Sequence, residues 1–260
     1  ANGAPLLNPD GTLQVERASE DRHRVDGRTL TIAGTVGLPI GDGGHLNLSA
    51  EYQGRDPTNR TGPDVRRQYS LINGALDPRE LTFDRYSHRY GDAKTDDLKF
   101  FMNFGAPIAD AAELYGYLTY GYRDGESAGF YRLASDARNV PAIYPDGFLP
   151  LINSDLNDFE GVLGVKGDVG GWRYDLSGSY GRNAFDFFIT NTLNRSFGPA
   201  SQRAFDSGGL RYTQAMGNLD VSRDLEVGFF KNLTLAGGLE YRRETFRIRP
   251  GEPASYANGP

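Results

Sequence analysis

Apolar and polar residues alternate with a period of two along much of the chain. In the stretch WRYDLSGSYGRN, Trp172, Leu176 and Tyr180 fall on one side, and Arg173 and Asp175 fall on the other. Because successive side chains of a β-strand point to opposite faces, such a stretch predicts a strand with one apolar and one polar face. Eight strands are predicted in this way, near residues 28–38, 45–53, 97–105, 113–122, 158–167, 172–183, 214–222 and 233–242.

The apolar sides of these eight segments carry neither a charge nor an amide, although 24% of all residues are charged. A soluble β-sandwich also alternates, since its apolar sides face a core. Lipid is a second explanation, because a charge on a lipid-facing strand position costs about 2–4 kcal/mol near the midplane of the bilayer. The pattern of side chains alone therefore fits either the core of a soluble protein or the lipid of a membrane.

The lengths of the connections favour lipid. Short stretches such as PIGDGG, PIADAA and DVGG alternate with long ones near residues 54–96, 123–157 and 184–213, and the connection near 223–232 is intermediate. Transmembrane barrels have tight turns at one rim and long extracellular loops at the other, whereas a sandwich has no reason to sort its loops by length. We therefore predict an all-β fold, the wall of an antiparallel up-and-down transmembrane β-barrel.

Aromatic residues lie at the ends of the apolar columns. Trp172 opens and Tyr180 closes one column, and Tyr52, Tyr122 and Tyr241 fall at the loop-side ends of theirs. Aromatic rings concentrate at the headgroup level of membranes, where one part of the ring is buried and the other is wet. The spacing of the aromatic residues thus agrees with a strand that crosses a bilayer.

Composition narrows the possible functions. The 260 residues include 34 Gly and 12% aromatic residues, which suits strands and turns better than helices. A net charge of -6 argues against a nucleic-acid partner. The absence of Cys excludes disulfides, thiolate metal sites and cysteine nucleophiles.

Strand order predicts that both ends of the chain lie at the long-loop rim. Stand-alone bacterial barrels generally end in the periplasm, yet this sequence ends in PASYANGP, and residues 1–26 and 243–260 look like halves of two further loops. We therefore expect residues 1–260 to be one partial barrel domain, an incomplete part of a larger wall. Open outer strands would leave backbone groups unpaired, so we do not expect this part to fold alone.

Several stretches resemble the TonB-dependent receptors of the bacterial outer membrane. They are LNLSAEYQGRDPTNRTGPD (46–64), IYPDGFLPLI (143–152), GGWRYDLSGSYGRN (170–183) and GLEYRRETFRIRPGEPASYANG (238–259). The resemblance implies an outer-membrane barrel of about 22 strands around a plug. It also implies uptake of a scarce nutrient such as a ferric siderophore, lipid and lipopolysaccharide as neighbours, and coupling to the TonB complex through a plug. The TonB box, the plug and the closing strand have no counterpart in these residues.

Two loop stretches mix Arg with Tyr in an otherwise acidic chain, RRQY (66–69) and DRYSHRY (84–90). Arg offers a planar fork for carboxylates or phosphates, and Tyr offers stacking and a hydroxyl, which would suit an anionic aromatic ligand. Loop packing, or Arg contacts with lipopolysaccharide phosphates, would use the same residues. The candidate ligand contacts are Arg66, Arg67, Tyr69, Arg85, Tyr86, His88 and Tyr90.

The charged residues on the polar sides of the strands would face the lumen of a barrel. We expect them to pair with one another and with a plug, which is a structural role. They are Lys99, Glu160, Lys166, Arg173, Asp175, Asp220, Glu240 and Arg242.

No stretch of the sequence predicts catalysis, a cofactor or a metal site. His23, His45 and His88 lie far apart without acidic neighbours at ligand spacing, GDGG is not followed by Lys-Ser/Thr, and no Gly-x-Ser-x-Gly occurs. Two other functions stay open beside the receptor. One is a passive porin-like channel, and the other is a soluble β-rich binding or adhesion module.

Overall fold

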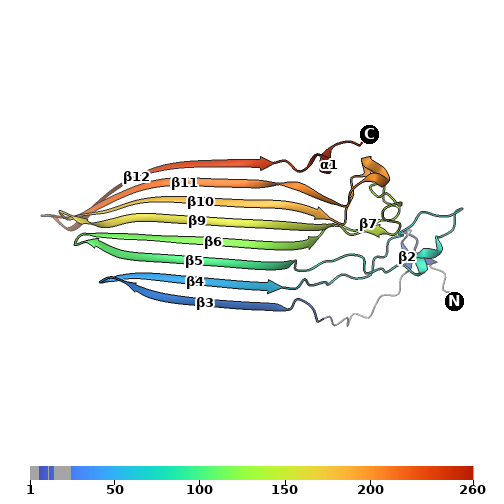
Figure 1. Ribbon diagram of the computed structural model, residues 1–260, viewed down its shortest axis with the longest axis horizontal. Helices are drawn as coiled ribbons and strands as arrows, with labels where there is room; N and C mark the ends of the chain where they lie inside the picture. The colour runs from blue at the N-terminus through green and yellow to red at the C-terminus, as the bar shows by residue number, and fades with distance from the viewer. Residues whose placement is uncertain (1–5, 11, 15–24, 260) are drawn as a thin grey trace.

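One large antiparallel sheet of eight strands dominates the computed structural model, which describes residues 6–10, 12–14 and 25–259 (Figure 1). Each strand pairs with its neighbours along the chain, so the sheet is a simple meander whose edges are the first and the last strand. The two edge strands do not pair with each other. The strands are β3 (Thr29–Ile40), β4 (Gly44–Arg55), β5 (Lys94–Ala109), β6 (Ala112–Ala128), β9 (Leu151–Val169), β10 (Trp172–Thr190), β11 (Ala204–Val227) and β12 (Phe230–Arg249).

Short and long connections lie at opposite ends of the sheet (Figure 1). The tight turns are residues 41–43, 110–111, 170–171 and 228–229, and the long connections are 56–93, 129–150 and 191–203. Gly170 and Gly171 form a two-residue turn with positive φ angles of 61° and 76°, a conformation that suits Gly. We call the two ends of the sheet the turn end and the loop end.

The small elements all lie at the loop end, beside the C-terminus (Figure 1). Among the described residues they include two short strand pairs and three short helical segments. These elements are β1 (Leu6–Leu7), β2 (Leu13–Gln14), β7 (Arg132–Leu133), β8 (Gly147–Phe148), η1 (Pro78–Leu81), η2 (Arg195–Ala200) and α1 (Pro253–Tyr256).

Every strand except β3 extends further toward the loop end than the sequence predicts. The predicted loops 54–96, 123–157 and 184–213 shrink accordingly, and the connection predicted near 223–232 is only the turn 228–229. Alternation fails in these extensions because both sides carry polar residues, for example Asp96 beside Asp97. The backbone nevertheless stays in register, with Asp96 opposite Asp124 and Asp124 opposite Asp155.

Strand register places the apolar columns of all eight strands on one side of the sheet. In one row Val36 lies opposite Leu48, which lies opposite Met102. In another row Leu176 lies opposite Leu219, which lies opposite Leu239. We call this side the apolar face and the opposite side the polar face.

No second layer covers the apolar face within the described chain, because the long strands contact their sheet neighbours and no second sheet packs on them. Leu176 keeps 57% of its surface exposed and Leu239 keeps 75%. Soluble monomers rarely leave apolar patches of more than a few hundred Å² uncovered. The apolar face therefore requires a partner or a solvent other than water.

Gly164 on the polar face allows an aromatic side chain to cross its strand. A Cβ at Gly164 would lie 2.6 Å from Cζ of Tyr115, whose hydroxyl donates a hydrogen bond of 2.7 Å to Asp175. Tyr115 of β6 thus spans β9 and reaches β10. This contact fixes the alignment of three strands.

We expect Gly164→Ala to destabilise the folded sheet by about 1–3 kcal/mol, because the added methyl displaces the Tyr115 ring. Gly121→Ala is the matched control, since a Cβ there would meet no atom closer than 3.8 Å. The control should be neutral or slightly stabilising. Urea unfolding of both variants in detergent measures the difference, and equal midpoints would refute the role of Tyr115.

Candidate functional site

Hydrogen bonds and ion pairs run across the polar face from strand to strand. Lys99 pairs with Glu51 at 2.9 Å, and Tyr117 donates to Glu160 at 3.1 Å. All the charged residues predicted to face a lumen lie on this face. The remaining contacts are Lys166–Glu113 at 3.5 Å, Arg173–Asp224 at 2.9 Å, Tyr115–Asp175 at 2.7 Å and Arg242–Glu240 at 3.0 Å, whereas Asp220 lies opposite Asp175 and Gly238.

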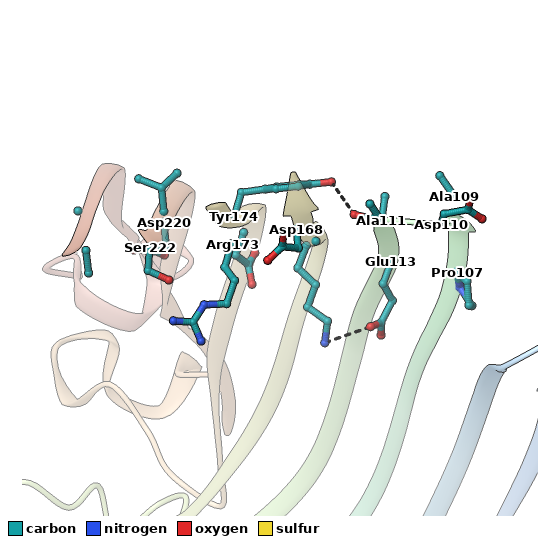
Figure 2. A pocket seen from close by; sticks show the side chains of 17 residues that line it. Pro107, Ala109, Asp110, Ala111, Glu113, Asp168, Arg173, Tyr174, Asp220 and Ser222 are labelled. Carbon is teal, nitrogen blue, oxygen red and sulfur yellow. Dashed lines mark hydrogen bonds and ion pairs between the residues drawn. The ribbon is translucent and has the colours of Figure 1, made fainter. Parts of the chain in front are cut away.

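Figure 2 shows the hollow in which this face ends near the turns, a cavity of about 960 Å³ between β5 and β12. The Lys166–Glu113 pair lies along it, and the Tyr174 hydroxyl donates to the Ala111 carbonyl at 3.4 Å. Arg173 and Asp220 also line it. Of the charged side chains that line the hollow, Glu113, Lys166, Arg173 and Asp175 have hydrogen-bond or ion-pair partners within the sheet. No cluster of three potential metal ligands occurs in the described residues.

The long loop 56–93 is organised around a buried carboxylate. Glu80 has a fully buried side chain, and its Oε1 accepts hydrogen bonds from the backbone N–H groups of Gln68 and Tyr69 at 2.8 and 2.9 Å. Its Oε2 accepts from Arg85 at 2.5 Å, and the Arg85 side chain is only 11% exposed. Asp77 caps the short helix η1 that carries Glu80, through the N–H of Arg79.

A second cluster of buried side chains connects the stretches RRQY (66–69) and DRYSHRY (84–90). Arg66 forms a two-pronged pair with Asp64, at 2.9 and 2.7 Å, and its guanidinium lies 3.2 Å from Nε2 of His88. Burial raises the pKa of Asp64, but hydrogen bonds from Arg66 and Gln68 lower it by more than burial raises it. The pKa of Asp64 therefore lies below its ordinary value. Asp64 therefore stays ionised.

The long connections 56–93, 129–150 and 191–203 pack together at the loop end, and we call them the loop layer. The structure places most of the candidate ligand contacts inside it. Arg66 and Arg85 are held by carboxylates, and Tyr69 is 3% exposed and donates to Asp146 at 2.8 Å. The sequence could not separate these roles, because an Arg that binds a ligand and an Arg that pairs with a buried carboxylate read alike. Of the other four, Arg67 and Tyr90 are exposed, Tyr86 is half-buried and His88 is buried.

His88 is neutral in this environment. It stacks on Tyr90, with ring centroids 5.6 Å apart, and meets the edge of Phe130 at 5.1 Å. Burial lowers the pKa of His88 below its ordinary 6.5, and Arg66 adds to this, although Asp64 acts in the opposite direction. Because Arg66 can only donate, Nε2 of His88 must accept, which also requires the neutral ring.

The loop layer should lose stability as the pH falls below about 6.5. In that range the unfolded segment binds a proton at His88 while the folded one resists it, so the free energy of unfolding decreases with falling pH and is fully present above pH 6.5. Limited proteolysis of residues 56–93 against pH measures this effect. His88→Gln should flatten the pH profile below pH 6.5, and an unchanged profile would assign the dependence to other groups.

A second hollow opens among the loops, and the sequence alone did not reveal it. It measures about 570 Å³ and is lined from three segments distant in the chain, including Phe130, Arg132, Arg138, Arg195 and Tyr256. None of the described residues that line it is acidic. We call this feature the loop hollow.

The charge of the loop hollow is positive. Arg138 is held by Asp136 at 2.8 Å, and that hydrogen bond lowers the pKa of Asp136 to about 2. Arg132 and Arg195 form no salt bridge within the described residues. Phe130 adds an aromatic wall that is 49% exposed, and the Arg66 guanidinium lies 4.9 Å from the centre of its ring.

Arg66 and His88 contact Phe130 without lining the loop hollow, whereas Arg132 and Arg195 line it. Such a hollow can bind an anionic, flat molecule, since Arg pairs with carboxylates or phosphates and aromatic rings stack on planar groups. Only contacts between distant segments create it, which is why local sequence patterns did not predict it.

Comparison with protein-family models and with curated proteins finds no match to this chain. None of the helices in the described residues has the length and apolarity required to cross a bilayer. The geometry of the sheet and the loops is therefore the basis for a functional hypothesis.

Proposed function

We propose that this chain forms part of the wall and outer loops of a TonB-dependent receptor in the bacterial outer membrane, which takes up an anionic nutrient such as a ferric siderophore. One observation carries the proposal. An eight-stranded meander has an uncovered apolar face, with no charge along its predicted apolar columns, and a hydrogen-bonded polar face on the opposite side. A barrel wall between lipid and a wet interior needs this arrangement.

The sorting of the connections supports the same proposal. All three long connections and all the small elements lie at the loop end, where an outer-membrane receptor would meet its ligand (Figure 1). The loop hollow there is cationic and partly aromatic. In this proposal Arg132 and Arg195 contact the ligand, whereas Glu80 and Arg85 maintain the loops that position it.

In the proposed barrel, β3 and β12 pair with further strands, because lipid cannot satisfy the open edges of a sheet. The polar face then lines the interior, and the hollow at its turn end faces a plug (Figure 2). The charged residues of the polar face act as structural contacts of that interior. No step of bond making or breaking is part of the proposal.

Cell fractionation and uptake test the proposal with the protein expressed from its complete gene. We expect recovery in the outer membrane, extraction only with detergent, and uptake of a ferric siderophore that stops when TonB is deleted. Recovery in the soluble fraction without detergent would overturn the membrane role. Uptake that persists without TonB would instead support a passive channel.

Ligand contact has its own test. Arg132→Ala combined with Arg195→Ala should weaken siderophore binding by about tenfold or more, since each substitution removes a charge-assisted hydrogen bond. Arg67→Ala is the control, because Arg67 is exposed in the loop layer and does not line the loop hollow. Equal binding by both variants would place the ligand elsewhere.

A further inference from the structure

Three aspartates form a row on the apolar side of the sheet, where the strands run beyond the predicted apolar columns toward the loops. Asp96 of β5 lies directly opposite Asp124 of β6, and Asp124 lies opposite Asp155 of β9. Asp96 is two residues from Leu98, and Asp124 is two residues from Tyr122, so each shares the side of its apolar column. We call these three aspartates the acidic row.

The acidic row is unfavourable within the sheet by itself. Like charges that lie directly opposite each other destabilise a pair of strands. Tyr52 donates a hydrogen bond of 2.7 Å to Asp96, and Lys94 lies 3.9 Å from the same carboxylate. Asp124 and Asp155 are exposed and form no salt bridge within the described residues. Cations supplied from outside the chain would therefore stabilise the row.

Arginines occupy the corresponding surface of β10 and β12. Arg182 lies two residues beyond Tyr180, and Arg243 and Arg247 lie two and six residues beyond Tyr241, all on the apolar side of their strands. These three arginines are exposed and form no salt bridge within the part of the chain that the structure describes. We call them the basic group.

The surface charge changes sign between β9 and β10, which are neighbours in the sheet (Figure 1). The row of aspartates continues to Asp186 of β10, which lies opposite Asp155. Asp186, however, is neutralised by Arg211 at 2.6 Å and by Arg249 at 2.9 Å. The side toward β5 is therefore acidic, and the side toward β12 is basic.

A surface with an acidic and a basic half is complementary to a second copy of itself. A two-fold axis normal to the membrane, between β9 and β10, places β9 of each copy against β10 of the other. The acidic row of each copy then faces the basic group of the other, so both contacts form at once. Two-fold dimers with such self-complementary contacts are the commonest closed assemblies of proteins.

A partner of one charge would not satisfy this surface. The acidic row would repel an anionic partner, and the basic group would repel a cationic one, whereas a second copy brings both signs in the required order. The apolar surface next to the charges is low on β10 and β11, which allows two copies to approach. A Cβ at Gly178 would meet no atom closer than 3.8 Å, and one at Gly217, directly opposite, would meet none within 4 Å.

We propose that this chain associates side by side with a second copy in the membrane, as a two-fold dimer in which the acidic row of each copy pairs with the basic group of the other. The inference rests on the proposed function, because it places the apolar sides of both copies in one bilayer. A single exposed ion pair contributes little, but every pair occurs twice in a two-fold contact. The charges also exclude a shifted contact, which would bring like charges together.

The test uses the protein expressed from its complete gene, produced in two copies that carry different affinity tags. Co-purification of the two tags from membranes in detergent measures association, and native mass spectrometry shows what the complex contains. The basic variant is Asp124→Lys combined with Asp155→Lys, and the acidic variant is Arg182→Glu combined with Arg247→Glu.

We expect the unmodified protein to contain two copies, and each variant alone to associate at least about tenfold more weakly, because like charges then face each other across the axis. The basic and acidic variants produced together should associate with each other as well as unmodified copies do. This rescue also shows that both variants fold. Asp42→Lys combined with Asp110→Lys is the control, since it makes the same change of charge at exposed positions in two tight turns and should not alter association.

Several outcomes would overturn the inference while the protein remains in the membrane fraction. They are single copies of the unmodified protein, a different protein in the complex, and unchanged association of either variant. Loss of association that is not restored when the two variants are produced together would also overturn it. Failure of the proposed function would appear separately, as recovery without detergent.

Discussion

Leu176→Arg should reduce the stability of the folded sheet in lipid by about 2–4 kcal/mol. Leu176 lies midway between Trp172 and Tyr180 on the apolar face, and 57% of its surface is exposed. In the proposed membrane it therefore points into hydrocarbon near the midplane. An Arg there must be desolvated or must deform the bilayer, and both are costly.

The same substitution separates a membrane protein from a soluble one. At an exposed position in water, Leu176→Arg would change the free energy of unfolding by no more than about 0.5 kcal/mol. The expected effect is several times larger only if lipid covers the apolar face. Because Leu176 is exposed in the structure, a large loss of stability on substitution would show that lipid, not water, surrounds it.

Ser179→Arg is the matched control, because Ser179 lies three residues along the same strand on the polar face. Both variants are made in the protein expressed from its complete gene. Folding of each variant from urea into lipid vesicles, followed by the shift in electrophoretic mobility of unheated samples, measures both stabilities. We expect the control to fold nearly as well as the unmodified protein. Equal folding of Leu176→Arg and Ser179→Arg would argue against lipid contact.

The sequence predicted the sheet well where one face is uniformly apolar. The alternation in β4 and β10 shows where these strands lie, because a one-residue slip would bury charges such as Glu51 and Arg173 in the apolar face. Toward the loop end the pattern vanishes, as at Asp96 and Asp97, and the predicted strand 97–105 therefore misses residues 94–96 of β5.

Less of the candidate site than of the sheet could be predicted from the sequence. Arg66 and Arg85 were predicted as ligand contacts, yet both pair with carboxylates of the same loop, Asp64 and Glu80. The loop hollow depends on Arg132 and Arg195, which lie in separate loops that meet only in the folded chain. Local composition shows which groups a loop carries, and only packing decides which of them face a ligand.

Glu80→Ala should release the loop 56–93 from its folded arrangement, at a cost of about 3–5 kcal/mol. The substitution leaves Arg85, 11% exposed, without its carboxylate, and it removes the acceptor for the N–H groups of Gln68 and Tyr69. Hydrogen exchange at those two amides measures the opening of the loop directly. Arg67→Ala, at an exposed neighbouring position, should leave both amides protected.

Glu80→Ala should also affect the loop hollow. Arg66 lies in the same folded segment as Glu80 and contacts Phe130, which forms a wall of the hollow. Release of the segment frees Phe130, so Glu80→Ala should weaken ligand binding although Glu80 itself does not line the hollow. Strands β5 and β6 should keep their protection, because their hydrogen bonds lie within the sheet. Faster exchange at Gln68 and Tyr69 with unchanged ligand binding would show that the hollow forms independently of this loop.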